Sequence, residues 1–147
     1  MRNILPKSMI LFFPLAMVAA DCNKKSSAQS KMGLLTKAAW RYEKAGFDSN
    51  QQGVMDVLDP LITDCQKDDL TIFYPDGTGS FDAGSLPCKP SDPSSLPFFW
   101  SFQNNAKNIY FLEQNFTIKT LTDNKLEINS TQDFGGIKTN YIIVFKH

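Results

Sequence analysis

The feature that most constrains the fold is a series of short segments rich in aromatic and β-branched residues, each followed by a turn signal. Segments of this kind predict β-strands bounded by turns. In the first of them, Trp40 and Tyr42 alternate with Arg41 and Glu43, which predicts one apolar face and one solvated face. Eight such segments follow one another, at residues 38–47, 69–74, 78–84, 98–103, 108–114, 116–121, 126–132 and 137–147.

Eight antiparallel strands with short connections can form either an up-and-down barrel or a sandwich. An immunoglobulin sandwich would place a tryptophan between two core cysteines, but Trp40 precedes both Cys65 and Cys88, and Trp100 follows them. Closure into a barrel also removes exposed strand edges, and eight strands leave an interior that can hold one small ligand. We therefore predict an all-β fold, an eight-stranded antiparallel up-and-down barrel.

The connection between the first two predicted strands carries a helical spacing. Apolar residues recur in residues 53–65 at offsets of three and four: Val54, Val57, Leu58, Leu61 and Ile62. Pro60 lies among them and would split or shorten a helix. We expect a short helical insertion here, and a long loop rich in proline and serine at residues 85–97.

The N-terminus has the pattern of a targeting segment. Arg2 and Lys7 precede an uncharged apolar run at residues 9–20. Twelve residues rise only about 18 Å as a helix, against a hydrocarbon core of about 30 Å. Residues 1–21 are therefore predicted to be a signal peptide rather than a membrane span, and the protein is predicted to be exported.

Cys22 closes the apolar run and precedes a polar segment. A cysteine in this position resembles a bacterial lipoprotein signal, in which the cysteine is acylated and becomes the first residue after cleavage. Asp21 replaces the small residue usual before that cysteine, and ordinary cleavage after Ala20 is the alternative. On the lipoprotein interpretation, residues 22–31 are a lipid-anchored flexible tether, and residues 32–147 form one domain.

Several motifs together resemble a known family. They are "LLTKAAW" at residues 34–40, "CQKDDLTIFYPDGTGSFDAGSLPC" at 65–88, "FFWSF" at 98–102 and "FTIKTLTDNKLEI" at 116–128. The chain resembles the lipocalin-like domain found in lipoproteins of Bacteroidetes bacteria. Ala38 departs from the family pattern, which favours glycine two residues before the first-strand tryptophan. The most specific residues, in order, are Cys65, Asp68, Asp69, Phe73, Gly77 and Cys88. The resemblance implies a small lipocalin-like (calycin-type) barrel in the cell envelope, and it implies no known substrate.

The two cysteines bracket one predicted hairpin. In an exported chain Cys65 and Cys88 can oxidise to a disulfide, and closing this loop would stabilise the fold by roughly 3 kcal/mol. A redox or metal-binding pair is the alternative, but the spacing is neither Cys-x-x-Cys nor a zinc pattern. We therefore predict a structural disulfide between Cys65 and Cys88.

Groups suited to catalysis are scarce. Asp68 and Asp69 could do acid–base work or hold a cation, but neighbours in a strand point to opposite faces, and hydrogen bonds to nearby backbone amides are the simpler interpretation. His147 is the single histidine and the last residue, so no histidine-based triad can be built elsewhere. We predict no catalytic residues, no metal site, no cofactor and no enzymatic activity.

Aromatic residues are the richest signal, with twelve Phe, four Tyr and two Trp. Alternation predicts that nine side chains face inward and are candidates to line a ligand site: Trp40, Tyr42, Phe73, Phe98, Trp100, Phe102, Phe111, Phe116 and Ile118. They can either fill the barrel or line a cup for an apolar molecule.

These features lead to a prediction of function. We expect a cell-envelope lipoprotein that binds a small hydrophobic or amphipathic ligand. The alternative is a filled barrel that binds an envelope protein or a glycan through residues 53–65 and 86–97. Equal numbers of basic and acidic residues, 15 of each, argue against a nucleic-acid partner. No acidic cluster follows Cys22, so we expect the anchor to lie on the periplasmic face of the outer membrane.

Overall fold

The strands form a closed antiparallel barrel. The computed structural model describes residues 22–60 and 62–147. Eight strands follow one another around the barrel, and a pairing between the first and the last closes it. They are β1 (Trp40–Asp48), β3 (Leu70–Phe73), β4 (Thr78–Asp82), β5 (Ser95–Gln103), β6 (Asn108–Phe111), β7 (Gln114–Leu121), β8 (Lys125–Phe134) and β9 (Ile137–Lys146). The predicted eight-stranded up-and-down barrel is confirmed.

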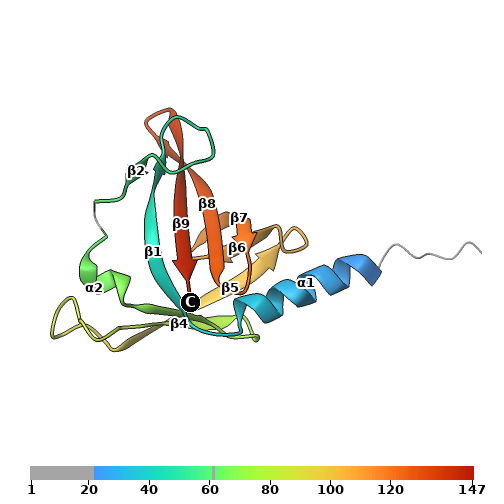
Figure 1. The fold of residues 1–147 in the computed structure, drawn as a ribbon, viewed down its shortest axis with the longest axis horizontal. Coiled ribbons are helices and arrows are strands. Elements are labelled where there is room, and N and C mark those ends of the chain that lie inside the picture. Colours follow the sequence, from blue (N-terminus) through green and yellow to red (C-terminus); the bar gives the residue numbers. More distant parts are fainter. Residues whose placement is uncertain (1–21, 61) are drawn as a thin grey trace, which may run out of the picture.

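The closure of the barrel is uneven. β3 pairs with only the first two residues of β1, Trp40 and Arg41. On its other edge β1 pairs with β9 from Arg41 to Asp48, with an irregularity between Tyr42 and Lys44. Figure 1 shows the result: β1, β8 and β9 stand side by side, and β4 and β5 run across beneath them. The upper part of β1 therefore lacks a long strand on the side facing β3.

The segment between β1 and β3 covers that side of β1. The two-residue strand β2 (Val57–Leu58) pairs with Gly46 and Phe47 of β1. The predicted short helical insertion is present as one turn, α2 (Asp64–Lys67), at the C-terminal end of the segment. Most of the residues with helical spacing therefore do not form a helix, because Val57 and Leu58, before Pro60, pair with β1 as a strand.

The end of the barrel near β3, β4 and β5 is filled by aromatic side chains. Phe73 makes ring contacts with Phe98, Trp100 and Phe111, at centroid distances of 5.4, 5.5 and 5.3 Å. The Trp100 indole N–H is satisfied by the Thr78 carbonyl oxygen at 2.8 Å. Buried aromatic rings of this kind contribute much of the stability of a small core.

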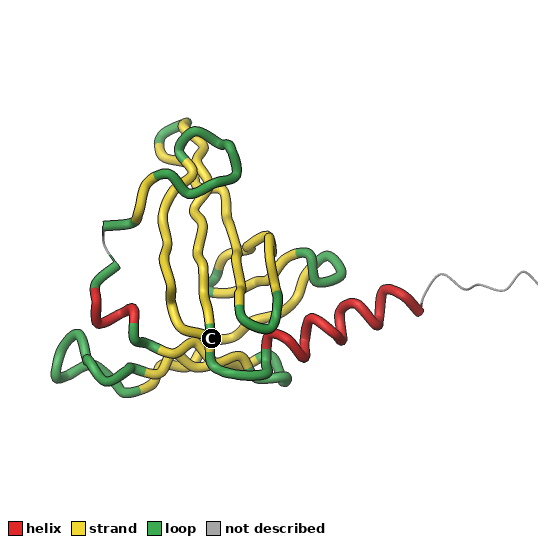
Figure 2. Tube along the Cα trace, in the orientation of Figure 1, coloured by secondary structure: helices red, strands yellow, loops and turns green. Residues whose placement is uncertain are grey.

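Residues 22–31 differ from the predicted flexible tether. They belong to helix α1 (Cys22–Leu35), and Figure 2 shows this helix extending away from the barrel. No glycine or proline, the two strongest helix breakers, interrupts the chain between Cys22 and Met32. The last turn is held by the barrel, because Leu35 is fully buried and its carbonyl oxygen accepts the Trp40 indole N–H at 2.8 Å.

Two more predictions from the sequence concern the start of β5 and the N-terminal signal peptide. β5 begins at Ser95, so residues 95–97, predicted as loop, are strand and pair with residues 80–82 of β4. The predicted signal peptide at residues 1–21 lies outside the described residues. Across residues 22–60 and 62–147, the helices are too short or too polar to cross a membrane.

Candidate functional site

A cavity of about 380 Å³ lies on the inner side of β1, β7, β8 and β9, towards the end where β8 turns into β9. Four strands, the turn between β6 and β7, and the segment before α2 each contribute to its wall. The lining is mostly aromatic and aliphatic, and none of the described lining residues is charged. The lining residues are Tyr42, Phe47, Ile62, Leu112, Gln114, Phe116, Gln132, Phe134, Tyr141 and Ile143.

The pairing of β1 with β9 sets the depth of each wall residue. Phe47 lies opposite Tyr141, and Tyr42 lies opposite Phe145, deeper in the barrel. The rings of Phe47 and Tyr141 are 5.0 Å apart, and that of Tyr42 meets Phe145 edge-on at 5.8 Å. Phe134, at the end of β8, is more than half exposed. The cavity therefore has a buried floor near Tyr42 and an apolar rim formed by Phe47 and Phe134.

The nine side chains predicted to line a ligand site divide between the cavity and the core. Tyr42 and Phe116 line the cavity, and Phe116 belongs to the buried core cluster as well. Phe102 and Ile118 are partly buried and pack against the core. The remaining five are buried within the core cluster: Trp40, Phe73, Phe98, Trp100 and Phe111. The sequence left two alternatives, aromatic side chains that fill the barrel or aromatic side chains that line a cavity. The filled core and the lined cavity lie at different ends of the same barrel.

Most of the cavity wall was not among the predicted site residues. Tyr141 and Ile143 follow the same alternation along β9 that identified Trp40 and Tyr42 on β1, so the sequence pattern could have found them. Leu112 and Ile62 lie in a turn and a loop, where no periodicity applies. Their place in the wall depends on how the chain closes.

A tyrosine–carboxylate pair provides the polar part of the site. The Tyr141 hydroxyl donates to Asp59 Oδ2 at 2.7 Å. The Asp59 backbone N–H in turn donates to the Ala45 carbonyl oxygen at 2.9 Å. Asp59 therefore joins the segment between β2 and α2 to both β1 and β9, and it fixes the Tyr141 ring at the cavity wall.

The second tyrosine, Tyr42, has a buried hydroxyl. Its oxygen is shielded from solvent, and the polar group beside it is the Tyr141 hydroxyl, which acts on its pKa. Burial raises the pKa of Tyr42 to about 12, the Tyr141 hydroxyl offsets part of that rise, and the Asp59 carboxylate adds to it. Burial also raises the pKa of Tyr141, and the hydrogen bond to Asp59 raises it further. Both phenols are therefore uncharged at neutral pH.

The paired carboxylates of Asp68 and Asp69 lie elsewhere and hold a loop. Asp68 Oδ2 accepts hydrogen bonds from the Ser85 hydroxyl and the Leu86 backbone N–H, both at 3.0 Å. Asp69 Oδ1 accepts one from the Gly84 backbone N–H at 3.2 Å. The simpler interpretation from the sequence, hydrogen bonding to nearby backbone amides, is confirmed. Within the part of the chain that the structure describes, no three His, Cys, Asp or Glu side chains gather as a metal site would require.

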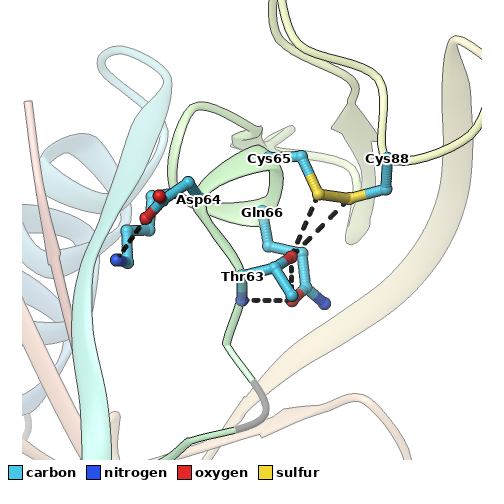
Figure 3. Close-up of polar contacts among 6 residues, drawn as sticks. Thr63, Asp64, Cys65, Gln66 and Cys88 are labelled. Atoms are coloured by element: carbon cyan, nitrogen blue, oxygen red, sulfur yellow. Dashed lines mark hydrogen bonds and ion pairs between the residues drawn. A yellow bond between two sulfur atoms is a disulfide. The ribbon is translucent and has the colours of Figure 1, made fainter.

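The predicted disulfide between Cys65 and Cys88 is confirmed. Its Cα atoms are 5.3 Å apart, and it joins α2 to the loop after β4. Figure 3 shows Thr63, at the start of α2, beside the bridge. Its hydroxyl lies 3.0 Å from Cys65 Sγ and donates a hydrogen bond to Gln66 Oε1. The Gln66 side chain accepts the Thr63 backbone N–H at 2.9 Å, which caps the helix. Because Ile62 directly precedes this cap, the bridge also anchors one wall of the cavity.

No model of a protein family matches this sequence, and a comparison with curated proteins found no match. The fold and the cavity therefore carry the functional argument.

Proposed function

We propose that this protein is a lipocalin-like binding module that holds a small hydrophobic or amphipathic molecule in the cavity beside β8 and β9. The observation that supports it most is the cavity itself. Its volume, about 380 Å³, falls within the range of roughly 300–1,000 Å³ common for ligand pockets, which are apolar with a few placed polar groups. Here the polar groups are two glutamines and the pair formed by Tyr42 and Tyr141.

The proposal places the protein in the cell envelope. The apolar run at residues 9–20 and the cysteine that follows it support export and lipid attachment at Cys22. The disulfide supports an oxidising compartment, since structural disulfides are rare in the cytosol. A lipid on Cys22 would lie at the start of α1, which extends away from the barrel in Figure 2. The periplasmic face of the outer membrane is the proposed side.

The anchor can be tested separately from the ligand. Mass spectrometry of the intact protein purified from membranes should show an acylated N-terminal Cys22, and the Cys22→Ser variant should partition into the aqueous phase. An unmodified chain beginning at residue 21 would instead support cleavage after Ala20, and it would refute the anchor.

A second candidate function is binding of a protein or glycan through the loops. Exposed apolar side chains on the two loops named from the sequence favour it: Val54 and Leu58 before α2, and Leu86 after β4, are each more than half exposed. Single exposed apolar residues are normal on protein surfaces, so this candidate ranks below the cavity.

The two candidates can be separated by blocking the cavity. Gln114 lines it from β7, whereas its neighbour Asn115 is exposed and belongs to the opposite face of the same strand. A Gln114→Trp variant should abolish binding of small apolar probes in a calorimetric titration, and Asn115→Trp should leave it unchanged. Equal binding by both variants, or none by the parent protein, would refute a ligand site in this cavity.

A further inference from the structure

The turn between β6 and β7 is built from residues that do not suit its backbone. Phe111 pairs with Gln114, so the hairpin has a two-residue turn made of Leu112 and Glu113. Both residues have positive φ angles, 53° and 58°. Such turns are usually made by Asn-Gly or Gly-Gly, because a side chain at positive φ crowds the backbone. The turn therefore carries a backbone cost that better suited residues would avoid.

The β8–β9 hairpin shows the usual solution in the same protein. Its turn also has two residues, since Phe134 pairs with Ile137, and both are glycines at positive φ, Gly135 and Gly136. Leu112, by contrast, is 47% exposed and is not among the described residues that form the core or pack against it. Core packing therefore does not explain why the β6–β7 turn keeps a leucine, and retained strain of this kind is typical of functional sites.

Leu112 lies where two spaces meet. It lines the cavity of about 380 Å³, and it also lines a groove of about 630 Å³ whose walls come from β4, β5, β6 and this turn. The described walls of the groove are mostly aromatic and aliphatic, and they include Leu96, Phe98 and Phe99 of β5. No lysine, arginine or histidine is among the described lining residues of either space. Both spaces therefore suit an uncharged, apolar occupant.

Aromatic rings connect the wall of the cavity to the wall of the groove. Phe116, which lines the cavity, contacts Phe111 at a centroid distance of 6.2 Å. Phe111 in turn contacts Phe98, which lines the groove, at 5.0 Å. Apolar surface therefore continues from one space to the other beside Leu112.

The cavity has a second neighbour at its rim. Phe47 and Phe134 also border a groove of about 330 Å³, together with Val57 and Ile137. This groove is about half as large as the one beside β5, and the turn next to it is made of glycines. The groove beside β5 is therefore the larger continuation of the cavity, and it is the one whose turn keeps a costly side chain.

We propose that the groove beside β5 is a second compartment of the ligand site, and that the ligand crosses Leu112 to occupy both spaces. The chemical class that fits is an elongated molecule with an uncharged hydrocarbon chain. This inference rests on the proposed function, because it extends the same cavity and names the shape of the molecule held there.

Two alkyl maltosides with the same neutral head test the length of the site. Octyl maltoside and dodecyl maltoside are titrated calorimetrically into the mature protein, each below its micelle concentration. Burial of a methylene raises affinity by about fourfold, so the longer chain should bind about tenfold more tightly or better. Equal affinities would refute the second compartment and leave the binding function standing. Binding of neither probe would refute the proposed function together with this inference.

A matched pair of variants shows which groove holds the longer chain. Leu96 and Ile137 are both exposed apolar residues, at 53% and 72%, and each borders one of the two grooves. Leu96→Asp should remove most of the advantage of dodecyl maltoside and leave octyl maltoside unchanged, whereas Ile137→Asp should leave both affinities unchanged. Loss of the advantage in Ile137→Asp alone would place the chain at the rim and contradict the proposal.

The role of Leu112 is tested by asparagine, which tolerates positive φ. Leu112→Asn should weaken dodecyl maltoside binding about three- to tenfold, because an apolar contact is lost, without lowering the thermal midpoint. Gln51→Asn makes the same kind of change at another residue of positive φ, 58°, and should leave both affinities unchanged. A lower midpoint for Leu112→Asn would mean that this leucine is retained for folding, and unchanged binding would mean that the ligand does not cross it. Either result would overturn the inference.

Discussion

Removal of the Cys65–Cys88 disulfide should destabilise the protein by an amount that the loop length sets. The bridge closes a loop with a sequence separation of 23. The chain-entropy relation, −2.1 − 1.5R ln n cal/mol/K, then gives about 3.4 kcal/mol at 25 °C. The Cα–Cα distance of 5.3 Å is within the usual range of about 4.4–6.8 Å, so no backbone distortion should be released on removal.

Loss of side-chain packing should add little to this change in unfolding free energy. Cys88 is exposed and Cys65 only half-buried, so alanine at both positions removes few buried contacts. The hydrogen bonds of Asp68 to Ser85 and Leu86 remain in the variant and keep the same loop near α2. We therefore expect the Cys65→Ala/Cys88→Ala variant to lose about 2–4 kcal/mol of unfolding free energy, through the unfolded state.

Urea denaturation of the mature protein without reductant, followed by tryptophan fluorescence, measures this loss. Cys22→Ala is the matched control, because it removes a cysteine outside the bridge and should leave the midpoint unchanged. A loss below about 1 kcal/mol would refute the entropic account and mean that the loop is already restrained when the chain is unfolded. A loss well above 5 kcal/mol would mean that the bridge supports native packing, contrary to its exposure.

Two other perturbations test the core and the tyrosines. Gly79→Ala should lower stability by about 1–3 kcal/mol in thermal unfolding, because a Cβ there would overlap the Phe98 ring and the Ile72 carbonyl oxygen. The control variant Gly33→Ala lies in α1 with open space around it, and it should be neutral or slightly stabilising. Since the pKa of Tyr42 rises from 10.0 to about 12 on folding, the native state holds its proton more tightly than the unfolded state does, so stability should fall as pH rises from about 10 to 12. Absorbance at 295 nm should show Tyr42 ionising near pH 12 in the native protein, and loss of that step in Tyr42→Phe checks the assignment.

The barrel could be predicted because its signal is local. Side chains alternate along a strand with a period of two, so Trp40 and Tyr42 on β1, and Phe98 and Trp100 on β5, reveal their inner face without knowledge of their partners. The structure buries Trp40, Phe98 and Trp100 in the core as this alternation requires. The disulfide was predictable for a similar reason, since it brackets a single hairpin.

The features that could not be predicted depend on partners far away in the sequence. Residues 95–97 are strand because β4 offers them an edge to pair with, although Pro97 and the neighbouring serines favour a loop. The C-terminal half of helix α1 is held by contacts with Trp40 and with the Ala106 carbonyl oxygen, which accepts a hydrogen bond from the Lys31 ammonium at 2.7 Å. Local composition, which favoured a tether, carries no information on these contacts.

The position of the cavity follows from the uneven closure of the barrel rather than from any motif. Where β3, β4 and β5 lie, large rings such as Phe73 and Phe111 meet across the interior and fill it. Further along β1, β3 no longer pairs, and the segment that carries Asp59 takes its place beside the strand. A loop cannot supply inward side chains at the regular spacing of a strand, so space remains in front of Tyr42 and Tyr141. The same topology that closes the barrel at one end therefore leaves a ligand-sized cavity at the other, and it places the two partly buried tyrosines at the boundary between them.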